Sequence, residues 1–236
     1  MTTEHAFSRT ELLLGAEAIQ RLQASHVTVF GVGGVGGYVA EALARSGVGA
    51  IDLIDPDKVT ITNLNRQIYA LHSTIGQLKV DVAEERILDI NPECVIRKFP
   101  LFYLPENADQ VPLADNDYVI DCIDTITAKI ELIRRCHELN IPLICSMGSA
   151  NKLNPMGFRV ADINETNIDP LARIIRKKLR KLNIPHLKVV YSEESPVIQH
   201  SLEEQNRPVP ASVAFVPAAA GLLIAAEVVR ELTFEL

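Results

Sequence analysis

Apolar residues run along the chain in short, uninterrupted blocks that alternate with segments of helical spacing. Four blocks have the length and composition of β-strands. They lie at His26 to Phe30, Ala50 to Ile54, Tyr118 to Asp121 and Leu143 to Ser146. Strands without polar alternation are typical of sheets that are buried on both faces. The pattern therefore predicts a parallel sheet covered by helices on both sides.

The intervals between these blocks have the spacing of amphipathic helices. The segment "GYVAEALARSG" has an apolar face and reaches Gly47, a residue suited to end a helix. Further helices are predicted from Gln77 to Asp89 and from Ile126 to Leu139, each stopped by a following proline. This order of elements predicts a doubly wound, Rossmann-like α/β fold with a mostly parallel sheet.

The pattern changes after Ser146 and indicates a C-terminal elaboration on the same sheet. We expect one helix from Pro170 to about Leu182 and a last helix that starts near Phe215 or Pro217. The polar interval from Pro100 to Asn116 predicts a loop. The charge-free stretch from Val209 to Ala226 approaches the length of a membrane span, so a membrane anchor is an alternative. Its prolines and many alanines favour a loop that leads into a buried helix.

Composition limits the class of protein. The chain has 236 residues, of which 47% are hydrophobic, and this is enough for a folded core. Its four cysteines form no C-x-x-C pair, so a four-thiolate zinc site is not predicted. The N-terminal stretch lacks the basic and then apolar pattern of a secretory signal. We therefore expect a globular protein of the reducing cytoplasm.

A glycine motif stands between the first strand and its helix. Gly31, Gly33 and Gly36 form G-x-G-x-x-G, and in this context backbone N–H groups at a helix N-terminus face a phosphate. Asp55 ends the second strand, at the separation where an acidic side chain accepts hydrogen bonds from a ribose. Alone, these features also fit a nicotinamide dinucleotide site or a tight turn without a ligand.

The segment after Asp55 is rich in hydrogen-bond donors. A plain dinucleotide site needs no such cluster, whereas cations near a polyphosphate lower the charge cost of attack at phosphorus. Each of these side chains, taken singly, is also compatible with a solvated surface position. Together they predict a triphosphate. The donors are Asn63, Asn65, Arg66, Gln67 and Lys79.

Five motifs in this order resemble a known superfamily: G-x-G-G-x-G, D-x-D-x-V, N-x-N-R-Q, G-x-x-K and "DCIDT". They are similar to the adenylating domain shared by MoeB, ThiF, HesA and the ubiquitin-activating enzymes. The resemblance implies that ATP and Mg²⁺ convert a carboxylate into an acyl adenylate, with Asp124 as the metal ligand. Capping of the following helix is another role for Asp124. The nucleotide-binding residues implied are Gly31, Gly33, Gly34, Gly36, Asp55, Asn63, Asn65, Arg66, Gln67, Lys79 and Asp124.

The same resemblance implies the catalytic groups. Arg66, Lys79 and Asp124 would act on the phosphates, and Arg9 would reach the ATP of the partner across a homodimer. Thr125 departs from the Asn that is usual at its position in the superfamily. An ordinary surface position is the other interpretation of Arg9.

Two stretches resemble one particular family within this superfamily. "NKLNP" and "DPLARIIRKKLRK" are similar to the family of tRNA threonylcarbamoyladenosine dehydratases, and the similarity extends from Phe7 to Glu231. It implies a ligase-type adenylating enzyme whose partner is tRNA carrying threonylcarbamoyladenosine, rather than DNA, with a sulfur-transfer protein as a further possible partner. In a single domain, residues 7–146 would bind the nucleotide and residues 147–236 would form the RNA side. No cysteine follows Cys145, so a thioester on the later loops is not expected.

The predicted helix from Pro170 concentrates positive charge. Between Pro170 and Lys188 lie seven of the 23 Lys and Arg residues and no acidic residue, in a chain whose net charge is −7. Such segregation suits contact with a phosphate backbone, although a solvated helix face has the same composition. An apolar stripe is expected at Leu171, Ile174, Ile175, Leu179 and Leu182. The predicted RNA-binding residues are Arg173, Arg176, Lys177, Arg180 and Lys181.

Two other functions stay open at this stage. One is an adenylyltransferase that activates the C-terminus of a ubiquitin-like sulfur-carrier protein. The other is a nicotinamide-dependent oxidoreductase or a non-catalytic nucleotide sensor, in which Arg66, Lys79 and Asp124 would be incidental.

Overall fold

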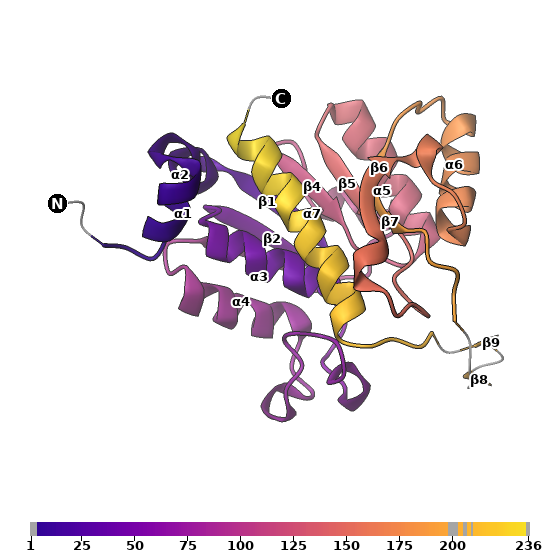
Figure 1. The fold of residues 1–236 in the computed structure, drawn as a ribbon, viewed down its shortest axis with the longest axis horizontal. Helices are drawn as coiled ribbons and strands as arrows, with labels where there is room; N and C mark the ends of the chain where they lie inside the picture. Colours follow the sequence, from indigo (N-terminus) through magenta and orange to yellow (C-terminus); the bar gives the residue numbers. More distant parts are fainter. Residues whose placement is uncertain (1–3, 198–202, 205–206, 209, 235–236) are drawn as a thin grey trace.

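The computed structural model describes residues 4–197, 203–204, 207–208 and 210–234. A seven-stranded sheet forms its centre, in the order β3-β2-β1-β4-β5-β7-β6 (Figure 1). All neighbouring strands are parallel except β6, which is antiparallel to β7. The strands are β1 His26–Phe30, β2 Ala50–Ile54, β3 Val95–Phe99, β4 Tyr118–Asp121, β5 Leu143–Ser146, β6 Phe158–Asp162 and β7 Lys188–Ser192. The predicted Rossmann-like α/β fold is confirmed.

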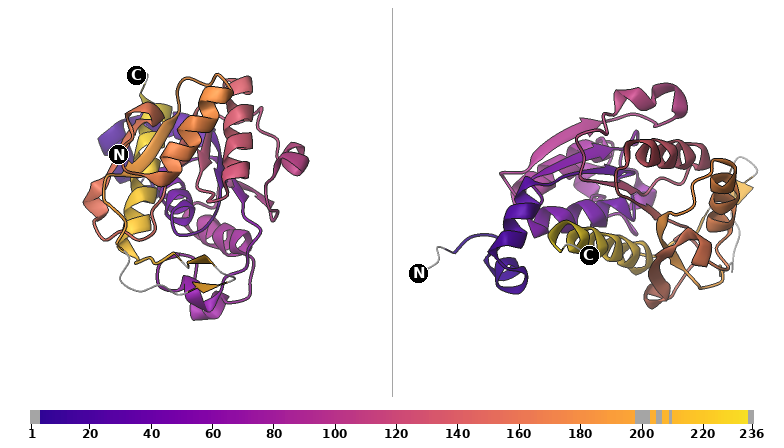
Figure 2. Two further views of the ribbon diagram at one scale, coloured as in Figure 1. Left: turned by 90° about the vertical axis from the view of Figure 1, so that its right-hand side faces the viewer. Right: turned by 90° about the horizontal axis from the view of Figure 1, so that it is seen from above.

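Helices cover both faces of this sheet. Helices α2, α3, α4 and α7 lie on one face, and α5 and α6 lie on the other (Figure 2). Alternate residues of each strand point to opposite cores. Val29 belongs to the core under α3, and the next residue, Phe30, belongs to the core under α5. The helices are α1 Ser8–Leu14, α2 Ala16–Ala24, α3 Gly36–Ser46, α4 Lys79–Ile90, α5 Ile126–Leu139, α6 Pro170–Lys181 and α7 Phe215–Thr233.

The direction of the sheet order reverses between β1 and β4. From β1 the chain continues through α3 to β2 on one side, whereas β4 pairs with β1 on the other side. At such a switch point the loops that follow the two strands part and leave a crevice at the carboxyl edge of the sheet. The glycine motif follows β1 and Asp124 follows β4, so the fold places both at this edge.

The four predicted strands have the predicted bounds. Of the first three of the five predicted helices, "GYVAEALARSG" corresponds to α3 and 126–139 coincides with α5. The helix predicted at 77–89 corresponds to α4, which begins at Lys79 because Leu78 is extended. The stripe predicted for α6 is wrong at Ile174 and Leu182, each 39% exposed, since the helix packs through Ala172, Ile175 and Leu179. Residues 100–116 include a short 3₁₀ helix, Pro105–Gln110.

The edge strand β3 and the helices α1 and α2 were not predicted. β3 reads "VIRKF", and Arg97 and Lys98 interrupt the apolar pattern because the strand lies at the edge of the sheet. Helix α1 has no buried residue, and Leu12 and Leu13 are more than four-fifths exposed. In contrast, α2 buries Ala18, Ile19 and Leu22, a helical spacing that the sequence does show.

The C-terminal apolar segment forms α7, which begins at Phe215 as expected. It packs along α3 and α2 and against the strands, where Lys188 pairs with Glu227 at 3.0 Å (Figure 1). Among the described residues, no helix combines the length and the apolar character needed to cross a bilayer.

Candidate functional site

The glycine motif forms a turn that only glycine can occupy at two positions. Gly31 has φ of 86°, and a Cβ there would lie 2.8 Å from the carbonyl oxygen of Cys122. A Cβ on Gly36 would lie 1.8 Å from the carbonyl oxygen of Gly31. Strand β1 therefore leads directly into α3 beside the loop after β4. Within the described residues no side chain caps the start of α3, which suits its N–H groups to an anion.

Asp55 is bound to this turn. Its Oδ2 accepts a hydrogen bond from the Val32 N–H at 2.7 Å, and its Oδ1 accepts one from the Asp57 N–H at 2.9 Å. The carboxylate is 5% exposed, and this burial raises its pKa against the opposing effect of the Lys79 charge. A buried carboxylate at the end of β2, beside the glycine turn, is arranged to accept hydroxyl hydrogen bonds.

Lys79 begins α4 and points back to the end of β2. Its Nζ lies 2.7 Å from Asp57 Oδ2 and 3.7 Å from Asp55 Oδ1. The side chain is buried, so its charge is exerted in an environment of low dielectric constant. The structure therefore brings the predicted lysine to the predicted carboxylate, although 24 residues separate them.

The segment from Asn63 to Gln67 lies over the glycine turn. The Asn63 carbonyl oxygen accepts hydrogen bonds from the N–H groups of Arg66 and Gln67. Arg66 Cγ lies 3.6 Å from the position of a Cβ on Gly34, and Gln67 Nε2 lies 3.7 Å from that of a Cβ on Gly33. Asn63 Oδ1 accepts from the Thr60 N–H, so only its amide nitrogen could face a phosphate. The donor cluster and the glycine turn are one site.

Asp124 lies on the exposed connection between β4 and α5. The preceding Ile123 nitrogen is 3.3 Å from the position of a Cβ on Gly31, so this connection adjoins the turn. The alternative role of Asp124 as the helix cap is wrong: the N-cap is Thr125, and no side-chain capping bond is formed there. Within the described residues no group of three potential metal-ligating side chains occurs.

A buried ion pair that the sequence did not predict supports this connection. Lys129 Nζ lies 2.9 Å from Asp121 Oδ2, and both side chains are 0% exposed. Burial would lower the pKa of Lys129, but the charge of Asp121 raises it above its ordinary value. Asp121 Oδ1 also accepts from the Ile123 N–H. The only sign in the sequence is a lysine on the apolar face of "ITAKIELI".

Arg9 lies far from the glycine turn of its own chain. It is exposed on α1, whose neighbour Phe7 packs on Gly47 at the C-terminal end of α3. The glycine turn is at the other end of this 11-residue helix, and 11 helical residues span roughly 16 Å. An Arg9 that acts on a nucleotide would have to come from a second chain.

In the basic helix α6, one residue has an environment that the sequence did not predict. Arg176 is half-buried, and its NH1 donates hydrogen bonds to the carbonyl oxygens of Ile163 and Thr166 at 2.9 and 2.8 Å. It holds α6 to the loop before it and is not a free cation, and its RNA contact stays a prediction. Asp169 caps the helix, since its Oδ1 accepts a hydrogen bond from the Ala172 N–H at 2.9 Å. The exposed basic residues are Arg173, Lys177, Lys178, Arg180 and Lys181.

The cysteines have the environment of inert thiols. Cys94, Cys136 and Cys145 are buried, and Cys122 is half-buried. Burial raises the pKa of Cys94 to about 11 and those of Cys122 and Cys136 to about 12. A nucleophilic thiolate requires a lowered pKa, so none of these thiols resembles a catalytic one.

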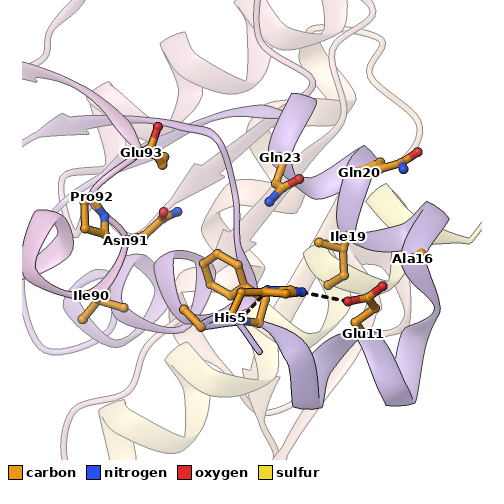
Figure 3. A pocket seen from close by; sticks show the side chains of 12 residues that line it. His5, Glu11, Ala16, Ile19, Gln20, Gln23, Ile90, Asn91, Pro92 and Glu93 are labelled. Atoms are coloured by element: carbon orange, nitrogen blue, oxygen red, sulfur yellow. Dashed lines mark hydrogen bonds and ion pairs between the residues drawn. The ribbon is translucent and has the colours of Figure 1, made fainter. Parts of the chain in front are cut away.

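A cavity of about 430 Å³ lies at the opposite end of the molecule, between α1, α2 and the end of α4 (Figure 3). Its lining includes Ile19, Ile90 and the hydrogen-bonded pair His5 and Glu11, whose Nε2 and Oε2 are 2.8 Å apart. None of the predicted site residues lines it. The candidate site is therefore the open carboxyl edge of the sheet and not this cavity.

Known proteins have the same sequence pattern and fold. The model of the ThiF family matches residues 7–234. The tRNA threonylcarbamoyladenosine dehydratase of Bacillus subtilis is 48% identical over 97% of this chain and 94% of its own length. The Escherichia coli tRNA N6-threonylcarbamoyladenosine dehydratase, solved in complex with AMP, has a TM-score of 0.88 at 35% identity, covering 96% of this chain and 93% of that chain. Its complex with ATP has a TM-score of 0.86. The chain therefore belongs to the ThiF family, and within it to the group of the tRNA threonylcarbamoyladenosine dehydratases.

Proposed function

We propose that the protein catalyses the ATP-dependent dehydration of threonylcarbamoyladenosine in tRNA. The observation that carries this proposal is the assembly of the glycine turn, Asp55, Lys79 and Arg66 at one edge of the sheet. The relatives supply the substrate class, since the Bacillus and Escherichia proteins have this activity in their names. The ATP complex of the Escherichia protein supports ATP as the nucleotide.

The reaction would begin with adenylation. An oxygen of the threonyl carboxylate attacks the α-phosphorus of ATP, the bond to the bridging oxygen breaks, and pyrophosphate leaves. Asp55 would hold the ribose, while Arg66 and Lys79 would balance the charge that grows on the phosphates. Asn63, Asn65, Gln67 and the backbone of the glycine turn would orient the nucleotide.

Asp124 would hold Mg²⁺ at the phosphates. Its exposed carboxylate offers the oxygen ligand that Mg²⁺ prefers, and this ion usually completes its shell with phosphate oxygens and water. Such an ion would neutralise charge on the departing pyrophosphate. The lack of a three-ligand cluster among the described residues agrees with a metal that is bound together with its nucleotide.

The second step would need no nucleophile from the protein. The neighbouring carbamoyl group attacks the carbonyl carbon of the acyl adenylate, AMP leaves with one carboxylate oxygen, and a proton is lost as the ring closes. Because the attacking group belongs to the substrate, proximity is provided by the substrate itself. The raised pKa values of the cysteine thiols agree with this mechanism.

The RNA would lie on the side of residues 147–236, with residues 7–146 as the nucleotide-binding part of one domain. The exposed cations of α6 support this, because the helix begins close to the loop after β5: a Cβ on Gly148 would lie 3.4 Å from Asp169 Oδ2. A homodimer in which Arg9 reaches the partner's ATP accounts for the distance between Arg9 and its own glycine turn. We place the protein in the cytoplasm, together with its tRNA. A sulfur-transfer protein as a further partner stays a prediction.

Pyrophosphate release tests the proposal. It should be fast with tRNA that carries threonylcarbamoyladenosine, and near background with tRNA lacking the modification or without RNA. Each turnover should produce one AMP and one product lighter by one water. Equal release in all three reactions would contradict the tRNA substrate. Transfer of AMP to the C-terminus of a sulfur-carrier protein would favour the adenylyltransferase alternative, which has a relative 35% identical over 53% of this chain, the molybdopterin-synthase adenylyltransferase of Escherichia coli.

A further inference from the structure

Asn151 has a backbone conformation that is rare for residues other than glycine. It follows β5 in the sequence "SMGSANKLNP" and has φ of 58°. Asn is among the few side chains that tolerate this region. Among the described residues, three other non-glycine residues have positive φ, and two of them, Asn140 and Asn183, lie at the ends of α5 and α6. Asn151 ends no helix, so its conformation has another cause.

The cause is a set of contacts with two distant segments. The Asn151 N–H donates to the Ala211 carbonyl oxygen at 2.8 Å, and Asn151 Oδ1 accepts from the Ala211 N–H at 2.9 Å. The Asn151 carbonyl oxygen accepts from the Val197 N–H at 2.7 Å. One residue therefore joins the loop after β5 to the segment after β7 and to the segment that precedes α7.

The segment that precedes α7 continues to the candidate nucleotide site. Asn65 Nδ2 donates to the Ser212 carbonyl oxygen at 2.9 Å, directly after the residue that Asn151 holds. Asn65 Oδ1 in turn accepts from Arg66 NH1 at 2.9 Å. Figure 1 shows this segment reaching the start of α7 above the loops that follow β2. Hydrogen bonds thus lead from Asn151 through residues 211–212 and Asn65 to Arg66.

We propose that Asn151 is a positioning residue that orients the Arg66 guanidinium through this route. The inference rests on the proposed function, because it takes Arg66 as the group that balances charge at the phosphates. The neighbouring Lys152 keeps the loop in place independently: its Nζ donates to the Glu194 carbonyl oxygen at 2.8 Å, and the Glu194 carboxylate accepts from the Leu153 and Asn154 N–H groups. Loss of the Asn151 side chain should therefore loosen the segment before α7 and leave the loop after β5 folded.

Asn151→Gly is the informative substitution, since glycine permits the positive φ and removes only the side-chain acceptor. We expect kcat for pyrophosphate release to fall on the order of tenfold, because a misplaced catalytic group lowers the rate without unfolding the protein. The KM for ATP should change less than kcat. Asn140→Gly and Asn183→Gly are matched controls with φ of 56° at both positions, and they should leave kcat unchanged.

The decisive measurement repeats Asn151→Gly in an Arg66→Ala background. If Asn151 acts through Arg66, the second substitution should cause no further loss of kcat. Asn65→Ala breaks the same route at its other end and also removes a side chain proposed to orient the nucleotide, so it should lose at least as much kcat as Asn151→Gly, and the double variant should equal Asn65→Ala. A full additional loss in the Arg66→Ala background, or wild-type kcat in Asn151→Gly, overturns the inference. If the wild-type protein itself releases no pyrophosphate with modified tRNA, the proposed function fails instead.

Discussion

Arg66 and Lys79 differ in how far their charges take part in folding. Arg66 is half-buried over the glycine turn and donates to the Thr62 carbonyl oxygen, whereas Lys79 is buried between two carboxylates. Arg66→Ala should lower kcat for pyrophosphate release by about 10²- to 10³-fold with little change in melting temperature, because its charge acts mainly on the phosphates. Lys79→Met should lower kcat similarly and also lower the melting temperature, since Asp55 then loses its counter-charge.

A lysine away from the site provides the control. Lys98, on the edge strand β3, pairs with Asp81 and Glu84 of α4 at 2.7 and 2.6 Å, and Lys98→Met should leave kcat unchanged. Equal pyrophosphate release in wild-type, Arg66→Ala and Lys79→Met proteins would show that the two cations are ordinary structural charges.

Asp52 gives a prediction about pH. It is 1% exposed and accepts hydrogen bonds from Arg97 Nε at 2.8 Å and NH2 at 2.7 Å. Burial would raise the pKa of this carboxyl, yet the hydrogen bonds from His26 and Arg97 lower it below its ordinary value. A lowered pKa in the folded state stabilises the protein above the unfolded pKa of about 3.9, and this stability is lost as pH falls through the folded value.

Denaturant unfolding of Asp52→Asn should show this dependence. The free energy of unfolding should be lower than that of wild type at pH 7, and the gap should shrink below about pH 4. Asp81→Asn, at an exposed pair with Lys98, should change little. A gap that stays constant down to pH 2 would mean that Asp52 contributes by packing alone.

At the scale of elements, α6 carries two kinds of positive side chain. Arg176 is hydrogen-bonded within the protein, whereas the other basic side chains are exposed. Replacing Arg173, Lys177, Arg180 and Lys181 by Glu, with Arg176 retained, should weaken tRNA binding and leave ATP binding intact. The salt dependence of binding should also become shallower, by roughly 0.9 logarithmic units for each lost phosphate contact on a duplex. Binding measured at several salt concentrations checks both effects.

Arg176→Ala is the complementary variant. It removes the bonds to Ile163 and Thr166 and should lower the melting temperature, with a smaller effect on the salt slope. If the fourfold reversal leaves both tRNA affinity and its salt slope unchanged, α6 is a solvated face and the RNA docks elsewhere.

The contact between α3 and α7 depends on Gly221. A Cβ there would lie 2.5 Å from the Val35 carbonyl oxygen, so Gly221→Ala should push the helices apart at a cost of about 1 to 3 kcal/mol. For a chain of this size each kcal/mol corresponds to roughly 2 to 4 °C in melting temperature. Gly33→Ala is the matched case, since its Cβ would make an ordinary contact with Gln67 Nε2 at 3.7 Å.

Gly33→Ala should therefore keep the wild-type melting temperature but bind ATP more weakly, because the methyl group occupies space beside the glycine turn. Calorimetric titration with ATP and a thermal scan distinguish the two variants. A stable Gly221→Ala protein would show that α7 can shift at no cost.

The central strands could be predicted because their apolar blocks adjoin glycine, proline or acidic residues. Asp55 and the glycine turn could be predicted for a similar reason, since both stand at the ends of such blocks. By contrast, β3 carries Arg97 and Lys98, and α1 exposes Leu12 and Leu13. The position of β3 is fixed by its pairing with β2 and that of α1 by its contacts with α2, and local sequence carries no record of either.

At the scale of the whole molecule, the contacts that complete the site join residues far apart in the chain. Asn151 and Ala211 are 60 residues apart, and Asn65 and Ser212 are 147 apart. The pair of Asp121 and Lys129 is closer, but its burial depends on the packing of α5 on the sheet. Sequence motifs could name the residues that would touch a ligand, whereas the partners that hold them became visible only in the folded chain.

Ligand binding gives the prediction that concerns the whole molecule. Mg-ATP should raise the melting temperature by mass action, because the candidate site consists of loops after β1, β2 and β4 that come together only in the folded state. At one hundred times its dissociation constant the ligand should add about 2.7 kcal/mol. NAD should give no comparable shift, since Arg66 and Lys79 are proposed to bind a triphosphate.

A thermal scan should compare Mg-ATP, ATP with a chelator, Mg²⁺ alone and NAD, each on wild-type and Asp124→Asn proteins. If Asp124 holds Mg²⁺ together with the nucleotide, the increment that Mg²⁺ adds to the ATP shift should be lost in Asp124→Asn, while the shift by ATP alone should persist. Glu4→Gln, at an exposed carboxylate near the N-terminus and outside the candidate site, is a control that should keep the full increment. Stabilisation by NAD and none by Mg-ATP would contradict the adenylation chemistry, because the donors after Asp55 would then serve no triphosphate.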